Sequence, residues 1–399
     1  MTPLLFSLLL GAFGTLAWAQ RGPTTDTVQT FNPEQVDATQ ERIATLQLPE
    51  GFSIAVFAEG FERPRMLAQA EDGTVYVTLE NTNEVAILRD TNGDGVADET
   101  TIQGDFGDVK QLHGVEIDGA TIYLASVKTV WKGTLGQDGG IEGLEPLVEN
   151  MPDGGQHKHR VIALGADGML YINLGSSCNV CVETNPEHAT ILRVNPEDGS
   201  GREIFATGLR NAQGFDWHPV TGEMWGTDHG MDWHGDDSPP EEVNRLEQGN
   251  DYGWPYCYGD QQANLASPLS APEGYDTLEQ YCRGATVGPV LEYQAHSAPI
   301  LFRFYEGAMF PDTYQNDAFV TMRGSWNRFP PTGYKVVRVM FDDSGEPTGF
   351  EDFVTGWLSE DGESQFGRIS GLLVMNDGSL LISDDSNGVL YRVSYEGGN

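Results

Sequence analysis

Short apolar segments separated by tight turns recur along most of the chain. In the clearest copies, at residues 66–80, 113–127 and 160–175, an apolar start leads through an Asp-Gly turn into an apolar-aromatic stretch. Further copies cover 213–230 and 369–388, and a looser one covers 298–324. Alternating apolar stretches joined by such turns predict antiparallel hairpins.

The number and spacing of the copies favour radial repetition. We predict an all-β fold, a six-bladed β-propeller of four-stranded antiparallel sheets over residues 49–397. The segment 51–60 is expected to complete the last blade and close the ring. Residues 251–297 look like an irregular insertion, and 239–247 is the best candidate for a short helix.

The N-terminal region has a different pattern. Residues 1–19 form an apolar run that ends in Ala17-Trp18-Ala19, which is typical of a signal peptide. Residues 20–48 are polar and are predicted to form a flexible leader. No other segment has the apolar length of a membrane span, so we expect a periplasmic or secreted protein.

Composition narrows the possible partners. The chain has 22 Lys and Arg against 60 Asp and Glu, a net charge of −38, which argues against nucleic acid as a partner. The four cysteines favour two disulfides, and Cys178–Cys181 with Cys257–Cys282 is the simplest pairing. A Cys-x-x-Cys redox or metal motif is the alternative for the first pair. Val182 follows in place of His, which excludes covalent haem attachment there.

Basic residues precede several predicted innermost strands, although the chain as a whole is acidic. In a propeller these positions converge on the central axis. They are Arg65, His113, His157 to Arg160, Arg210 to Gln213, Arg323 and Arg368. A ring of this kind predicts a cationic centre for a small anionic ligand. The alternative is that each arginine pairs with a nearby carboxylate.

Four long motifs carry a specific resemblance. They are GGQHKHRVIALGADGMLYINLGSSCNVC, GLRNAQGFDWHPVTGEMWGTDHG, PPEEVNRLEQGNDYGWP and GSWNRFPPTGYKVVRV. The chain resembles the glucose/sorbosone dehydrogenase family over about residues 48–396. These are exported six-bladed propellers that bind pyrroloquinoline quinone (PQQ) and calcium. The resemblance implies that PQQ accepts a hydride from C1 of a sugar while a His removes the hydroxyl proton.

The resemblance assigns the base to the segment His157-Lys158-His159-Arg160. His157 is the first choice and His159 the second, and a His bound to loop backbone is the alternative. Gln156 stands where the glucose-oxidising relatives carry their His. His159 and Arg160 are otherwise expected to bind the cofactor.

Further roles follow from the same motifs. Arg210 is expected to stabilise the charge that develops on the quinone, with Asn211 beside it and Gln213 bracing the turn. The backbone carbonyls of Gly230 and Met231 are expected to hold calcium.

One late position departs from the family pattern. Arg368 matches a cofactor-carboxylate arginine, but Ser370 replaces a second one. Arg323 or Arg328, with Trp326 as a stacking face, is expected to supply the missing charge.

A separate segment reads DTNGDGVAD. Its oxygen-bearing residues Asp90, Asn92, Asp94 and Asp98 resemble a short calcium loop. An Asx-rich turn is the alternative.

Three functions remain in competition. The first is a dehydrogenase that oxidises a small sugar or aldehyde and uses PQQ and Ca²⁺. Since no Cys-x-x-Cys-His occurs, electrons would pass to a separate acceptor, a cytochrome or a quinone. The second is a lactonase-like propeller with a metal in a cage of acidic side chains. The third is a non-catalytic propeller that binds a glycan or a protein partner.

Overall fold

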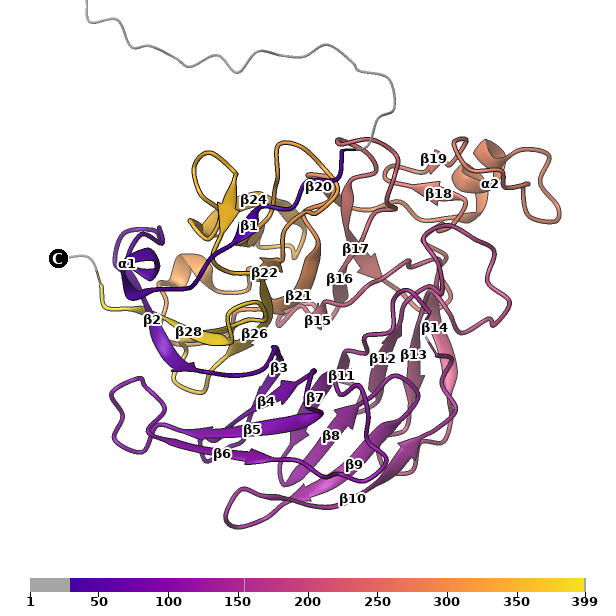
Figure 1. The fold of residues 1–399 in the computed structure, drawn as a ribbon. Helices are drawn as coiled ribbons and strands as arrows, with labels where there is room; N and C mark the ends of the chain where they lie inside the picture. The colour runs from indigo at the N-terminus through magenta and orange to yellow at the C-terminus, as the bar shows by residue number, and fades with distance from the viewer. Residues whose placement is uncertain (1–28, 154, 398–399) are drawn as a thin grey trace, which may run out of the picture.

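Six four-stranded antiparallel sheets surround a central axis in the computed structural model (Figure 1), which describes residues 29–153 and 155–397. The predicted signal peptide lies outside the described residues. The first two sheets are β3 (Pro64–Gln69), β4 (Val75–Leu79), β5 (Glu84–Arg89), β6 (Glu99–Gln103), and β7 (Gly114–Asp118), β8 (Thr121–Ala125), β9 (Val130–Leu135), β10 (Ile141–Val148). The next two are β11 (Ile162–Leu164), β12 (Leu170–Leu174), β13 (Thr190–Val194), β14 (Glu203–Thr207), and β15 (Phe215–Trp217), β16 (Met224–Asp228), β17 (Glu241–Leu246), β20 (Leu291–Tyr293).

The last two sheets complete the ring. The fifth holds β21 (Pro299–Phe304), β22 (Ala318–Met322), β23 (Lys335–Phe341) and β24 (Pro347–Val354). The sixth holds β26 (Ile369–Val374), β27 (Leu380–Asp384), β28 (Val389–Tyr395) and β2 (Phe52–Glu59). Because β2 pairs antiparallel with β28, the start of the propeller supplies the outer strand of its last blade. The predicted six-bladed propeller and its closure by residues 51–60 are confirmed.

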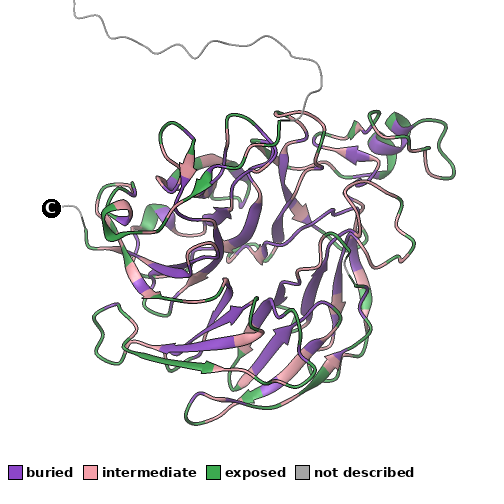
Figure 2. Ribbon diagram, in the orientation of Figure 1, coloured by how far each residue is buried: buried purple, intermediate pink, exposed green. Residues whose placement is uncertain are grey.

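Each repeated sequence segment supplies the two innermost strands of one blade. The second strands β4, β12, β16, β22 and β27 are buried at every residue. The outermost strands β6 and β2 carry exposed or half-buried residues at most positions, as Figure 2 shows at the rim. A continuous apolar run therefore marks a strand covered on both faces by neighbouring blades.

The Asp-Gly turns work as their chemistry predicts. Asp72 Oδ1 accepts the backbone N–H of Thr74 at 3.0 Å, and Asp167 Oδ1 accepts that of Met169 at 3.1 Å. The glycine that follows the aspartate has a φ of +90° at Gly73, a conformation that costs little only without a Cβ. These turns fix the register between the two inner strands.

Three expectations need correction. Residues 29–48 are not a flexible leader, because β1 (Glu34–Gln35) pairs with β25 (Ser364–Gln365) and Ile43 of α1 (Gln40–Ile43) is buried in the main core. The span 239–247 contains strand β17 rather than a helix. Five of its six residues are buried, and this tertiary packing overrides the helical propensity of the two glutamates.

The third correction concerns residues 251–297. This span holds β18 (Cys257–Tyr258), β19 (Gln262–Ala263) and α2 (Leu278–Ala285), but its end forms β20, the outer strand of the fourth blade. The predicted disulfides Cys178–Cys181 and Cys257–Cys282 are both present. Among the described residues, no helix has the length and apolar character needed to cross a membrane.

Candidate functional site

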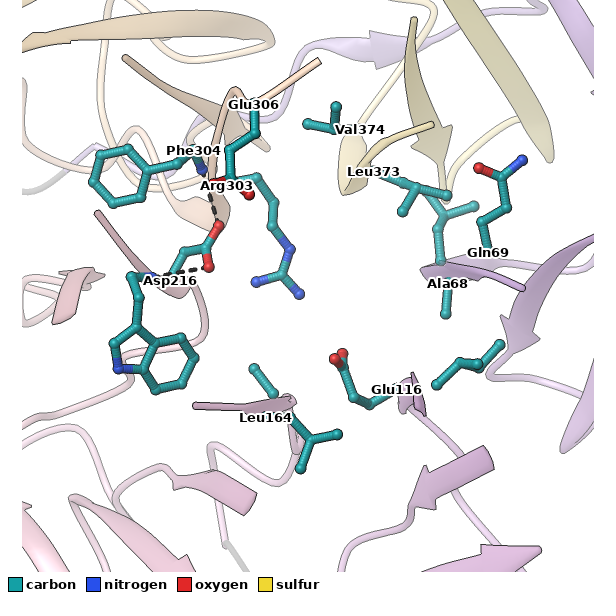
Figure 3. A pocket seen from close by; sticks show the side chains of 14 residues that line it. Ala68, Gln69, Glu116, Leu164, Asp216, Arg303, Phe304, Glu306, Leu373 and Val374 are labelled. Carbon is teal, nitrogen blue, oxygen red and sulfur yellow. Dashed lines mark hydrogen bonds between the residues drawn. The ribbon is translucent and has the colours of Figure 1, made fainter. Parts of the chain in front are cut away.

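The two ends of the propeller axis differ in chemistry. The final residues of all six innermost strands line a cavity of about 260 Å³, which contains Glu116, Asp216 and Arg303 (Figure 3). The opposite end, where these strands begin, carries the basic residues that the sequence singles out. We call it the top face, and the cavity at the other end the bottom cavity.

His157 is held on the top face in one tautomer. Its Nδ1 lies 3.1 Å from the Ser176 carbonyl oxygen and 2.8 Å from Ser176 Oγ. Since that Oγ already donates to the Cys178 carbonyl at 2.7 Å, both Ser176 atoms act as acceptors and Nδ1 carries the proton. The lone pair of neutral His157 therefore lies on Nε2. None of the described residues forms a hydrogen bond with this atom. Burial first, then Arg210 and His229, lower the pKa of His157 to about 2, which keeps the ring neutral.

The backbone beside His157 leaves no room for a side chain at Gly175. A Cβ there would lie 2.5 Å from His157 Cβ and 2.8 Å from the His157 carbonyl oxygen. Neither atom can move without moving the loop. Gly175→Ala is therefore expected to displace His157 and to lower catalytic activity by up to about 10²-fold, the scale on which a misplacement of about 1 Å acts. Gly284→Ala in α2, where φ is not positive and a Cβ would meet only a Tyr275 ring carbon at 3.8 Å, controls for the loss of a glycine. Equal activity in the two variants would contradict this packing argument.

Arg210 lies next to His157. Its backbone N–H donates to Asp228 Oδ2 at 2.8 Å, and its carbonyl accepts the N–H of Ser176 at 2.8 Å. The guanidinium is almost fully buried and its Nη2 lies 3.0 Å from Asp232 Oδ2. In the described part of the chain, Arg210 Nη1 has no hydrogen-bond partner. His157 and Arg210, predicted as a catalytic pair, are thus brought together.

Asn211 and Gln213 complete this side of the top face. The N–H of Asn211 donates to Asp228 Oδ1 at 2.6 Å, and its Nδ2 lies 3.2 Å from His229 Nδ1. The side-chain oxygens of Asn211 and Gln213 are buried with no hydrogen-bond partner in the described structure. Buried acceptors without donors are costly, and they fit a ligand that carries hydroxyl or other donor groups.

A second cluster occupies the other side of the top face. Arg65 Nε donates to His113 Nε2 at 3.2 Å, and its Nη1 pairs with Asp385. Arg323 binds both oxygens of the same carboxylate at 2.9 Å. Two guanidinium groups therefore share Asp385, and Arg65 has Glu80 Oε2 as a second acidic neighbour at 3.9 Å.

His159 belongs to this second cluster. Its ring stacks on His113 with centroids 4.5 Å apart, and its Nε2 lies 2.9 Å from Glu80 Oε1. Because a carboxylate only accepts, Nε2 of His159 holds a proton and is engaged. This geometry favours His157 over His159 as the proton acceptor.

Arg368 also lies on this side and has no acidic partner among the described residues. Its Nη2 donates to the Gly324 carbonyl at 2.6 Å, and its guanidinium lies 5.7 Å from the centre of the Tyr334 ring. No carboxylate of the described residues lies within 4.0 Å of it. Burial first, and Arg323 second, lower the pKa of Arg368 to about 10. A bound anion would relieve both effects.

Two predicted cofactor residues have other roles. Arg160 has no exposed surface, and its nitrogens donate to the carbonyls of Val127, Pro152 and His157 at 2.9–3.2 Å. Arg328 likewise donates to the carbonyls of Pro330 and Ala295 and pairs with Asp237. The expectation that Arg160 and Arg328 bind the cofactor is therefore corrected, since their guanidinium groups form hydrogen bonds that stabilise loops.

The metal predictions have different outcomes. Gly230 and Met231 follow β16 beside Arg210, and no hydrogen bond to their carbonyl oxygens occurs among the described residues. The Met231 side chain turns away and its sulfur accepts from Asn264 Nδ2 at 3.3 Å. The two carbonyls therefore fit the backbone ligands expected for calcium.

The loop at residues 90–98 instead matches the Asx-turn alternative. Asp90 accepts the N–H groups of Gly93 and Gly95 at 2.7 and 2.8 Å, and Asp98 accepts that of Thr91 at 3.0 Å. Asn92 and Asp94 likewise accept backbone N–H groups. Within the described ranges, the carboxylates of Asp90, Asp94 and Asp98 do not form a group of three whose oxygens all lie within 4.8 Å of one another.

The residues that sequence reasoning missed are mostly partners of those it found. They are Ser176, Asn179, Asp232, Glu80 and Asp385. Ser176 and Asn179 lie within a motif already singled out, so proximity to His157 could have indicated them. The three acids had no distinguishing signal among the 60 in the chain.

The bottom cavity holds a titrating carboxyl group. Burial raises the pKa of Glu116 to about 7, although Arg303 acts against it. An unfolded glutamate titrates near 4.3, so the folded wild type loses stability as the pH rises from about 4.3 through about 7. We therefore expect Glu116→Gln to be more stable, relative to wild type, at pH 8 than at pH 5 in urea unfolding. A pH-independent difference would show that Glu116 titrates normally.

The fold and the residues of the top face together define the class of protein to which the chain belongs. They place the chain among six-bladed propellers that carry a cluster of His and Arg over one end of the axis. The model of the TrAA12-like family matches residues 46–396, and the chain belongs to this family. The resemblance to PQQ-dependent soluble sugar dehydrogenases is thereby confirmed at the level of the family.

Two relatives and two solved structures illustrate the match. A Borreliella burgdorferi protein described as uncharacterized is 30% identical over 368 residues, 90% of this chain and 93% of that protein. A pyrroloquinoline quinone-dependent sugar dehydrogenase of Hypocrea jecorina is 24% identical over 97% of this chain and 95% of its own length. The calcium structure of the Trichoderma reesei family AA12 enzyme has a TM-score of 0.75 at 23% identity, covering 88% and 97% of the two chains. The holo PQQ domain of Coprinopsis cinerea pyranose dehydrogenase gives 0.73 at 22%, covering 88% and 97%.

Proposed function

We propose that this chain is an exported quinoprotein dehydrogenase that oxidises C1 of an aldose or a sugar aldehyde. The observation that carries the proposal is the pair His157 and Arg210, in which the tautomer of the imidazole is fixed and neither His157 Nε2 nor Arg210 Nη1 has a hydrogen-bond partner among the described residues. The PQQ-dependent relatives support the cofactor, and the two disulfides support an oxidising compartment, periplasmic or extracellular.

The residues present fit PQQ and calcium. Arg323 and Arg368 would hold the carboxylates of the quinone. Asn211 and Gln213 offer unpartnered side-chain oxygens to the hydroxyl groups of a sugar. The carbonyls of Gly230 and Met231 would hold Ca²⁺. When bound, PQQ supplies the two-electron acceptor for the hydride that leaves C1.

The chain's own groups handle the proton and the charge. His157 Nε2 is placed to take the proton of the C1 hydroxyl, while Ser176 keeps the ring in orientation through Nδ1. Arg210 Nη1 is available to stabilise negative charge that develops beside it. The two electrons would then leave to a separate acceptor, a cytochrome or a quinone.

The test is a titration of the metal-free protein with PQQ and CaCl₂, followed by dye-linked oxidation of a panel of aldoses. We expect saturable quinone binding, sugar-dependent dye reduction, and loss of activity with a chelator that calcium reverses. Absence of quinone binding at micromolar concentration would overturn the proposal and leave a non-catalytic propeller that binds a glycan.

A further inference from the structure

The loop closed by the Cys178–Cys181 disulfide contacts Arg210 directly and reaches His157 through Ser176. On one side, the Cys178 carbonyl accepts from Ser176 Oγ at 2.7 Å, and that same Oγ accepts from His157 Nδ1 at 2.8 Å. On the other side, Asn179 reaches Arg210. Its carbonyl accepts from Arg210 Nε at 3.3 Å, and its Oδ1 accepts from Nη2 at 2.9 Å.

Asn179 is itself held from three directions. Its Oδ1 accepts the N–H of Asp232 at 2.8 Å, and its Nδ2 donates to the Asp232 carbonyl at 3.0 Å. Its own carbonyl also accepts from Trp254 Nε1 at 3.1 Å. Asp232 in turn pairs with Arg210 at 3.0 Å. Asn179 and Asp232 therefore form a clamp that leaves Arg210 with one free nitrogen, Nη1.

The Cys178–Cys181 disulfide constrains the position of this clamp. Both sulfurs pack in a small apolar cluster with Met231 and Trp254, and both cysteines are partly exposed. The backbone between them is short, so the covalent link restricts the conformations of Asn179. Without the link, the loop would regain conformational freedom that the clamp must then remove.

We propose that the Cys178–Cys181 loop is the positioning device of the catalytic pair, with Asn179 as the positioning residue for Arg210, and that the device is sensitive to thiols. An added dithiol would break the S–S bond, leave two thiols at Cys178 and Cys181, and itself become a disulfide. His157 and Arg210 would then lose a common support. This inference rests on the proposed function for its kinetic consequence, but its structural part does not.

The first experiment compares Asn179→Ala and Asn179→Asp with wild type in the dye-linked assay, on protein loaded with PQQ and calcium. We expect Asn179→Ala to lower kcat by at least about tenfold, the scale of lost orientation, while KM stays within about twofold. Asn179→Asp keeps the oxygen that faces Arg210 and is expected to recover part of the loss. Wild-type kcat in the alanine variant would overturn the proposal.

The second experiment separates the two disulfides. The double variant Cys257→Ser, Cys282→Ser keeps only the Cys178–Cys181 bond and lies outside the proposed catalytic pair, so its kcat is expected to match wild type. Dithiothreitol, removed by gel filtration before PQQ and dye are added because it would reduce both, should lower that kcat by at least about tenfold, and reoxidation should restore it. An unchanged kcat after the bond is shown by mass spectrometry to be reduced would overturn the role of the disulfide.

A third readout needs neither cofactor nor activity. In protein labelled with ¹⁵N-arginine, the Arg210 Nε–H signal is assigned by its loss in Arg210→Lys. Its exchange with solvent should be slow in wild type, and at least about tenfold faster in Asn179→Ala or after reduction. If no sugar is oxidised by wild type, the proposed function fails, and this exchange rate alone decides the positioning: unchanged exchange overturns it.

Discussion

Alanine at position 157 is expected to lower kcat by about 10²- to 10⁴-fold, the range that a positioned general base contributes. His157 offers the lone pair of Nε2 because Ser176 takes the proton of Nδ1. Burial lowers the pKa of His157 to about 2, which keeps the ring neutral at any ordinary assay pH but makes it a weak base, so its assignment as the proton acceptor rests on the position of Nε2 and not on its pKa. Alanine removes the acceptor but no cation of the top face, so PQQ binding should persist.

Two neighbours in the same row of sequence serve as controls. Lys158→Ala changes an adjacent cation that makes no described hydrogen bond, and kcat should remain near wild type. His159→Ala removes a ring that Glu80 already engages, so we expect a smaller loss than at position 157. A larger loss at His159 than at His157 would reverse the assignment of the base.

The segment His157-Lys158-His159-Arg160 shows that the sequence predicts the position of these residues in the fold but not the partners of their side chains. That these residues precede an innermost strand is visible from the hydrophobic pattern, and the structure places them on the top face. Their individual partners are not visible. His157 bonds to Ser176, His159 to Glu80, and Arg160 turns inward to three carbonyl groups. Adjacent side chains diverge along the backbone, so one basic row supplies a base, a member of a cluster and a loop brace.

The blades themselves were predictable because their inner strands are covered on both faces. Continuous apolar runs flanked by Asp-Gly turns identified β3 with β4 and β26 with β27. The segment 29–48 was not, because Ile43 and Leu46 become buried only after the propeller offers them a surface. Likewise the two glutamates of β17 suggested a helix, whereas tertiary packing imposed a strand.

The acidic residues of the site could not be predicted from the sequence because their partners are remote in sequence. Arg65 and Asp385 are 320 positions apart, since the first and last blades meet only when the ring closes. Either of the sequence alternatives, a cationic centre or paired arginines, describes part of the result. Arg65 and Arg323 are paired but share one carboxylate, Arg210 has its own, and Arg368 has none within 4.0 Å among the described residues.

Replacing Asp385 by asparagine is expected to cost about 3–5 kcal/mol of unfolding free energy, as when one member of a buried ion pair is removed. The Asp385 side chain is 1% exposed and bridges Arg65 and Arg323, so its loss leaves Arg323 with no carboxylate within 4.0 Å among the described residues and Arg65 with Glu80 alone, at 3.9 Å. Asp352→Asn is the matched control. Its pair with Lys335 is 54% exposed on the acid side, and such pairs contribute less than about 1 kcal/mol.

The pH dependence of the same variant provides the sharper measurement. Burial opposes ionisation of Asp385, but Arg323 and Arg65 outweigh it and lower the pKa to about 2. An unfolded aspartate titrates near 3.9, so the stability that Asp385 contributes is complete above that pH and is lost as the pH falls toward 2. In urea unfolding, the gap in unfolding free energy between wild type and Asp385→Asn should therefore be constant from pH 7 to about 5 and narrow below 3.9. A gap that stays constant to pH 3 would show that asparagine acts by distorting the packing between the first and last blades rather than by removing the shared charge.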